Sequence, residues 1–125
     1  PFAPVKGGRF MAVGKSLISG STTLLILKLL SEKEMYGYEM IDTLAKRSEN
    51  VFELKAGTLY PLLHTLVSQG HLTCRELDCS GKIRKYYRIT KEGRRFLRQK
   101  TEEWNEYAGA VARVLSFGGN AYGTV

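Results

Sequence analysis

Hydrophobic residues recur at helical spacing in three stretches of the first half of the chain, and the first two predict a pair of packed helices. Leu17–Leu30 is rich in leucine and isoleucine around much of its circumference, which is typical of a helix that is buried or shared with a partner. After the polar segment Ser31–Glu34, apolar residues recur at helical spacing again. This second pattern predicts a helix over Met35–Ser48, followed by a connector over Glu49–Gly57.

The third stretch predicts a helix with two different faces. Five apolar residues follow the i, i+3, i+4, i+7, i+8 template of a buried helix face, namely Leu59, Leu62, Leu63, Leu66 and Val67. Pro61 has no amide hydrogen, so we expect the helix to start just before it. Gly70 is expected to end the helix.

The period then changes from helical to alternating. Two strand-like segments, HLTCREL and IRKYYRIT, flank a turn-forming tetrapeptide at Asp78–Gly81. Alternation in the second segment predicts one face with Ile83, Tyr87 and Ile89 and an opposite face with Arg84, Tyr86 and Arg88. Thr90 is expected to be the N-cap of a last helix, which runs to about Phe117 and is closed by Gly118 and Gly119.

Three short helices, a two-stranded hairpin and a long helix describe a mainly α fold with a small β-hairpin, the winged helix-turn-helix with an appended C-terminal helix. In this fold the third helix can enter a DNA major groove, and the hairpin is the wing. We expect the winged domain over 16–90, a dimerisation helix over 91–117 and a tail over 118–125. Residues 1–10 precede an internal Met11 and are set aside as an added or disordered segment.

The positive charge of the chain is concentrated in one segment. The 125 residues have a formal net charge of +7, whereas residues 82–100 hold nine basic residues and one acidic residue, a net charge of +8. A charge run is usually a solvated face, but this one covers the predicted wing and the start of the last helix, beside the third helix. Such a patch binds phosphates, so we expect double-stranded DNA as the partner. A membrane surface fits less well, because the charge lies partly on a hairpin.

The face of the third helix that points away from the leucines carries small or hydrogen-bonding groups, which suit close approach to base edges and phosphates. A solvated helix face usually carries glutamate and lysine, and this one carries neither. For Tyr60, DNA contact and half-buried packing both stay open. The candidate DNA-binding residues are Lys55, Thr58, Tyr60, His64, Thr65, Ser68, Lys82, Arg84, Lys85, Tyr86 and Arg88.

The last helix carries an apolar stripe that predicts a partner. Steps of four and three residues from Leu97 to Leu115 form a heptad pattern. Packing onto its own domain is the alternative, but the first three helices already have one another, so we expect a homodimer seam formed with the first helix. The expected dimerisation residues are Leu97, Trp104, Tyr107, Ala108, Val111 and Leu115. Trp104 is the single tryptophan, and it could pack within the seam or contact a flat effector.

Three segments of the sequence resemble the PadR family of bacterial transcriptional regulators: MYGYEMI, GTLYPLLHTLVSQGHL and GKIRKYYRITKEGRRFL. With the leucine-rich first helix, the resemblance covers 16–117, and the short chain after the wing is similar to the subfamily with a single C-terminal helix. The resemblance implies a homodimeric repressor on a palindromic operator, with effectors that are often aromatic, such as phenolic acids or lipophilic drugs and dyes. It also implies that Trp104 stands where drug-binding members offer an aromatic plane between subunits.

The other chemistry-bearing residues indicate neither an enzyme nor a metal site. His64 and His71 have no acid or nucleophile at a recognised catalytic spacing, and Cys74 and Cys79 have no matching pair for zinc. We expect no cofactor, a cytoplasmic protein and two inert thiols, with Cys79 as the more exposed one. The longest apolar run, Leu24–Leu30, is too short to span a membrane.

Three other functions stay open at this point. The chain could be a winged-helix protein-interaction module that never touches DNA, although the basic wing argues against it. It could be a stand-alone multidrug-binding protein without gene control. It could also be a single-strand or RNA-binding protein that stacks bases on Tyr86 and Tyr87, and it would then prefer single strands to duplex.

Overall fold

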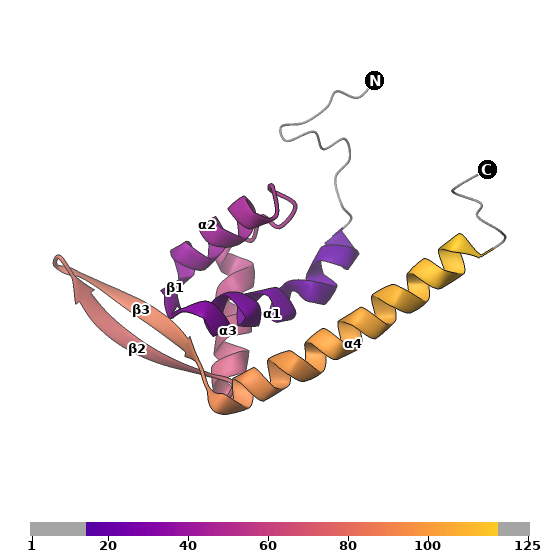
Figure 1. Ribbon diagram of the computed structural model, residues 1–125. Helices are drawn as coiled ribbons and strands as arrows, with labels where there is room; N and C mark the ends of the chain where they lie inside the picture. Colours follow the sequence, from indigo (N-terminus) through magenta and orange to yellow (C-terminus); the bar gives the residue numbers. More distant parts are fainter. Residues whose placement is uncertain (1–14, 118–125) are drawn as a thin grey trace, which may run out of the picture.

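The computed structural model describes residues 15–117, which form four helices and a small antiparallel sheet whose hairpin projects to one side of the helices (Figure 1). In chain order the elements are α1 (Lys15–Glu32), β1 (Met35–Tyr36), α2 (Gly37–Arg47), α3 (Ala56–Ser68), β2 (Leu72–Cys79), β3 (Lys82–Ile89) and α4 (Lys91–Ser116). The predicted class, a mainly α winged helix-turn-helix, is therefore confirmed. The expectations for residues 1–10, for Gly118 and Gly119, and for the tail lie outside the described residues.

The core lies where α1, α2 and α3 meet one face of the sheet. α1 buries side chains on several sides, as its all-round hydrophobicity predicts, and Ile26 and Leu27 have no exposed surface. The other buried hydrophobic residues are Leu29, Leu30, Met35, Met40, Leu44, Leu59, Leu63, Leu66, Leu72, Tyr87 and Ile89. The leucine face predicted for the third helix thus packs into this core.

The segment Met35–Tyr36 was expected to open the second helix, and this expectation is wrong. These two residues form β1, which pairs antiparallel with β3 and gives the sheet the order β1-β3-β2. The backbone of Tyr36 is extended, and α2 begins at the next residue. The amide of Tyr36 donates a hydrogen bond to the Glu39 carboxylate at 3.3 Å, so the helix start is closed by a side chain from its own first turn.

The start of α3 also differs from the expectation, because the helix begins at Ala56 and holds Pro61 in its second turn. The proline removes the hydrogen bond that the carbonyl of Gly57 would accept. Gly57 is exposed, so water can hydrate that carbonyl instead. The end of α3 is as predicted: Gly70 has a positive φ of 83°, and its amide bonds to Val67 while that of the next residue bonds to Leu66.

The wing is a regular hairpin with a two-residue turn. Ser80 and Gly81 both have positive φ, 55° and 82°, which matches the right-handed twist of the two strands. Residues of β3 alternate between faces as predicted, and Tyr87 and Ile89 are buried. Ile83 shares their face but is 63% exposed, because the hairpin extends beyond the core toward its tip (Figure 1).

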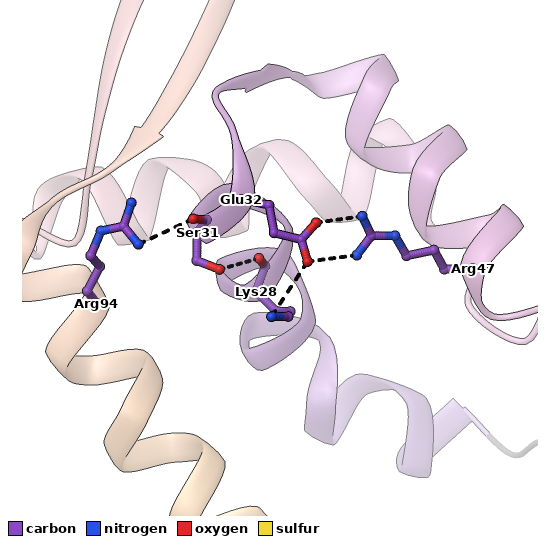
Figure 2. A network of polar contacts seen from close by, with 5 residues as sticks. All are labelled: Lys28, Ser31, Glu32, Arg47 and Arg94. Carbon is purple, nitrogen blue, oxygen red and sulfur yellow. Dashed lines mark hydrogen bonds and ion pairs between the residues drawn. The ribbon is translucent and has the colours of Figure 1, made fainter.

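α4 leaves the base of the wing and projects as a long rod (Figure 1). Its predicted N-cap is confirmed, because the Thr90 hydroxyl accepts a hydrogen bond from the Gly93 amide at 2.9 Å. Figure 2 shows how the last turn of α1 is joined to both α4 and α2. Arg94 donates to the Ser31 carbonyl at 3.2 Å, and Arg47 makes two hydrogen bonds to the Glu32 carboxylate.

Candidate nucleic-acid interface

The exposed face of α3 is formed by the side chains that the sequence predicted for it. Thr58, His64, Thr65 and Ser68 are all exposed. The hydroxyls of Thr65 and Ser68 already donate within the helix, to the Pro61 and Thr65 carbonyls at 3.1 and 3.0 Å. Their oxygens keep lone pairs for a donor on a base or a lysine, whereas the groups on Thr58 and His64 can both donate and accept.

The first turn of α3 favours an anion. Lys55 is the N-cap residue, and its side chain does not cap the helix. Ala56 and Gly57 follow it and are exposed, and no acidic residue stands in the first turn. The free amide hydrogens there carry the positive end of the helix dipole, so this end of α3 suits a DNA phosphate.

Tyr60 is a packing residue with an exposed edge. Its ring lies against Gly37 at the start of α2, where an added methyl group would come within 2.2 Å of the Tyr60 hydroxyl oxygen. The side chain is still 36% exposed. Of the two roles left open for Tyr60, packing is present in the structure, and its exposed part stays a candidate DNA contact.

The basic residues of the wing differ in exposure and in whether they form an ion pair. Lys82, Lys85 and Arg88 are exposed, whereas Arg84 is half-buried. Sequence reasoning missed Arg75 on β2, whose guanidinium makes two hydrogen bonds of 2.7 Å to Glu34. This pair holds the pKa of Glu34 below its usual range and joins the wing to the segment before β1.

Arg75 could have been found by pairing the two strands across the predicted turn. The register places Arg75 opposite Tyr86 and therefore on the arginine face of β3. Its partner Glu34 is distant in sequence, so no local pattern indicates the ion pair.

The two wing tyrosines have different environments. Tyr87 is 1% exposed, and burial raises the pKa of its phenol to about 12. Tyr87 therefore cannot serve as a stacking platform for single-stranded bases, contrary to one of the alternatives drawn from the sequence. Tyr86 is half-buried and meets the Tyr36 ring edge-on, with centroids 5.4 Å apart.

The basic run is divided between two places in the fold. Its C-terminal part lies on α4, which starts near the C-terminal end of α3, away from the helix start that carries Lys55 (Figure 1). Three basic residues of this part already have partners. Arg94 donates a hydrogen bond to the Ser31 carbonyl of α1, Arg95 forms an ion pair with Glu92, and Lys100 forms one with Glu103. The run thus covers the wing and the start of the last helix, as the sequence predicts, and the basic residues of the wing stay candidate DNA contacts.

The predicted dimerisation residues follow one side of α4. Leu97 is half-buried against the core, whereas Tyr107, Val111 and Leu115 are exposed. Trp104 is 45% exposed and lies at an open groove of about 820 Å³ between α1, α3 and α4. The groove is lined by Gly20, Ser21, Thr23, Leu24, Phe52, Leu62, Thr65, Leu66, Gln69, Phe96, Lys100, Glu103, Trp104 and Tyr107.

The two cysteines are free, and their exposures are the reverse of the expectation. Cys74 is exposed and Cys79 is half-buried, because Cys79 lies on the face of the wing that also carries Tyr86. Within the described residues, no three His, Cys, Asp or Glu side chains gather in a way that could hold a metal ion. No helix of residues 15–117 has the length and hydropathy needed to cross a membrane.

Comparison with known proteins identifies the family. Residues 26–99 match the PadR-like family of transcriptional regulators. The chain is 37% identical over 95 residues to the uncharacterized protein X of Lysinibacillus sphaericus, a match that covers 75% of this chain and 87% of that protein. It is 31% identical over 88 residues to the transcriptional regulator Rv3488 of Mycobacterium tuberculosis, covering 70% of this chain and 79% of that one.

A solved structure gives the same result for the fold. The PadR family transcriptional regulator from Eggerthella lenta superposes with a TM-score of 0.75 at 36% identity, covering 82% of this chain and 88% of that one. The chain therefore belongs to the PadR-like family of winged-helix, DNA-binding transcriptional regulators.

Proposed function

We propose that this protein is a repressor that binds a palindromic operator as a homodimer, with α3 in the major groove and the wing on the phosphates. The observation that carries the proposal is the exposed face of α3, where Thr58 and His64 have polar groups available for bases. The lysines of the wing, Lys82 and Lys85, are exposed in the half of β3 that follows the turn, and they supply charge for phosphates. A repressor of this kind acts in the cytoplasm by occupying a promoter.

The dimer is supported by two features of α4 that complement each other. The second half of the helix exposes large apolar side chains, with Val114 and Phe117 at 74% and 86% exposure. The first half and the middle of the helix border the groove, through Phe96, Lys100 and Trp104. An antiparallel pair of α4 helices would bring the apolar half of each copy toward the groove of the other, and such an isologous contact closes a two-fold dimer. A two-fold protein matches a palindromic site.

An effector site in the same groove is the second part of the proposal. Trp104 offers an aromatic plane there, and Leu62 and Thr65 of α3, with Gln69 directly after the helix, form another wall. A flat aromatic ligand would therefore contact α3, the helix proposed to read the DNA, as well as the seam of the proposed dimer. It would release DNA only if it binds more tightly to the arrangement that does not fit the operator.

The experiment that tests the DNA proposal compares three labelled probes with the wild-type chain. They are the inverted repeat flanking its gene, a random duplex and a single strand of the same length. We expect the inverted repeat to bind most tightly and the random duplex to bind with a steep salt dependence. Tighter binding to the single strand would favour a single-strand-binding protein, and failure to bind any probe would favour a protein-interaction module.

A further inference from the structure

Three aromatic and basic side chains meet on the outer face of the wing. The guanidinium carbon of Arg84 lies 4.4 Å from the centroid of the Tyr36 ring, within the range of a cation–π contact. The same Tyr36 ring meets Tyr86 edge-on at an interplanar angle of 64°. Because β1 pairs with β3 through Tyr36 and Tyr86, the backbone holds both rings in place. Arg84 therefore rests on a platform that is part of the sheet.

The charge of Arg84 is held in place but not neutralised. In the described part of the chain, no carboxylate lies within ion-pair distance of Arg84, whereas Arg75 on the neighbouring strand is paired with Glu34. Burial raises the pKa of the Tyr86 phenol, and the neighbouring Cys79 adds to the effect while Arg84 opposes it. Tyr86 is thus neutral at physiological pH and supplies no counter-charge.

A cation–π contact acts on the charge of a guanidinium and does not consume its N–H groups. Arg84 also hydrogen-bonds the Tyr86 phenol, but a guanidinium has five N–H groups, so enough remain for a bidentate hydrogen bond to phosphate. Arginine normally loses much side-chain freedom when it is immobilised on a phosphate. A guanidinium that already rests on a ring has given up part of that freedom before DNA arrives, so less is lost on binding.

We propose that Tyr36 is a positioning residue for DNA binding, whose ring presents the Arg84 guanidinium to a phosphate of the operator. The inference rests on the proposed DNA-binding function and adds a residue outside α3 and the wing to it. It also gives Arg84 a role distinct from that of Lys82 and Lys85, whose exposed ammonium groups act as mobile point charges.

The experiment measures the affinity for random duplex over a range of salt concentrations. It compares the wild-type chain with Arg84→Ala, Tyr36→Leu, Tyr36→Phe and the Arg84→Ala/Tyr36→Leu double variant. Tyr38→Leu on α2 is the matched control for loss of a tyrosine, because Tyr38 is 73% exposed and, within the described residues, its ring contacts neither Arg84 nor Tyr86.

Arg84→Ala is expected to lower the slope of log affinity against log salt by about 0.9 for each phosphate that the chain no longer neutralises, or about 1.8 for a dimer. Tyr36→Leu should weaken binding about two- to fivefold for each copy that contacts DNA, the range of an exposed cation–π contact, and lower the slope in the same direction. The double variant should be no weaker than Arg84→Ala alone. Tyr36→Phe keeps the ring and should restore wild-type behaviour, as should the Tyr38→Leu control.

Two results would overturn the inference while leaving the proposed function intact. One is a Tyr36→Leu chain that binds more weakly with an unchanged salt slope, since Tyr36 would then only brace the wing. The other is an Arg84→Ala chain with the wild-type slope, since Arg84 would then contact no phosphate. A wild-type chain that shows no salt-dependent duplex binding would remove the proposed function, and this inference with it.

Discussion

At the scale of single residues, the reading face of α3 is divided by which hydrogen-bonding atoms are already in use. Thr65 and Ser68 donate their hydroxyl hydrogens to carbonyls of their own helix. Thr58 and His64 show no such internal bond within the described residues and present both donor and acceptor atoms to solvent. Base edges in the major groove differ in their pattern of donors and acceptors, so residues with both capacities discriminate best.

Thr58→Ala and His64→Ala are therefore expected to lower operator affinity more than random-duplex affinity. The loss of preference should be about 1–3 kcal/mol for each residue that contacts a base. Ser68→Ala should change the preference less, because only its acceptor oxygen is available. Competition binding with the two duplexes measures the difference. Equal losses for both duplexes would show that Thr58 and His64 contact phosphates rather than bases.

At the scale of the elements, the junction between the wing and α4 sets the direction of α4. The Thr90 hydroxyl donates to the Gly70 carbonyl at 2.7 Å and accepts from the Gly93 amide. The backbone of His71 passes so close to Gly93 that an added Cβ would lie 2.1 Å from its carbonyl oxygen and 2.8 Å from a side-chain carbon of Ile89. Only a residue without a Cβ fits there without movement of backbone.

Gly93→Ala is expected to destabilise the fold by about 1–3 kcal/mol, the usual cost of forcing extra volume into a packed site. Chemical denaturation followed by circular dichroism measures it. Gly109→Ala, in the same helix, is the matched control, because the nearest atom to an added Cβ is the end of the Arg113 side chain at 3.6 Å. It should be neutral or stabilising by up to about 1 kcal/mol, since alanine is the better helix former. Equal stability of the two variants would contradict the close contact at Gly93.

The elements that the sequence predicts well are those whose signal is local. The leucine spacing of α3, the glycine after it, the turn of the wing and the Thr90 cap each depend on neighbours in the chain, and all four appear as predicted. β1 could not be predicted, because two residues are too few to show an alternating hydrophobic pattern. Their strand exists only through pairing with β3.

Long-range contacts also explain the other differences between sequence and structure. The Arg75–Glu34 pair joins residues that are far apart in the chain. The packing of Tyr60 on Gly37 depends on how α2 and α3 cross. The division of the basic run follows from the direction of α4, which charge spacing does not encode. The part of the candidate site that follows from one helix or one hairpin is therefore predictable, whereas the role of each charge within it is not.

At the scale of the whole molecule, α4 leaves an apolar surface that its own domain does not cover. Tyr107, Val114, Leu115 and Phe117 are each more than half exposed, and they follow the half of the helix that projects furthest from the core (Figure 1). Large apolar patches of this kind mark interfaces. In the proposed antiparallel dimer, the middle of each α4 lies nearest the two-fold axis, so the two Trp104 rings would lie close to that axis.

The last prediction separates the seam from the effector site. Val111→Glu should place an unpaired charge in the seam of each copy and weaken the dimer by about 3 kcal/mol, or roughly a hundredfold, with operator affinity lost alongside. Gln99→Glu adds the same charge at an exposed position and should stay dimeric. Sedimentation velocity distinguishes the two, and a dimeric Val111→Glu chain would refute the seam.

Trp104→Ala should instead stay dimeric and bind operator, while losing most of its affinity for a planar dye such as proflavine, because the dye loses the aromatic plane on which it stacks. Trp104→Phe keeps a smaller plane and should retain part of that affinity. Dye fluorescence measured without DNA gives the affinity directly. Dye binding that survives in Trp104→Ala would leave Trp104 as a packing residue of the seam and place any effector elsewhere in the groove, against Leu62 of α3 and Gln69 after it.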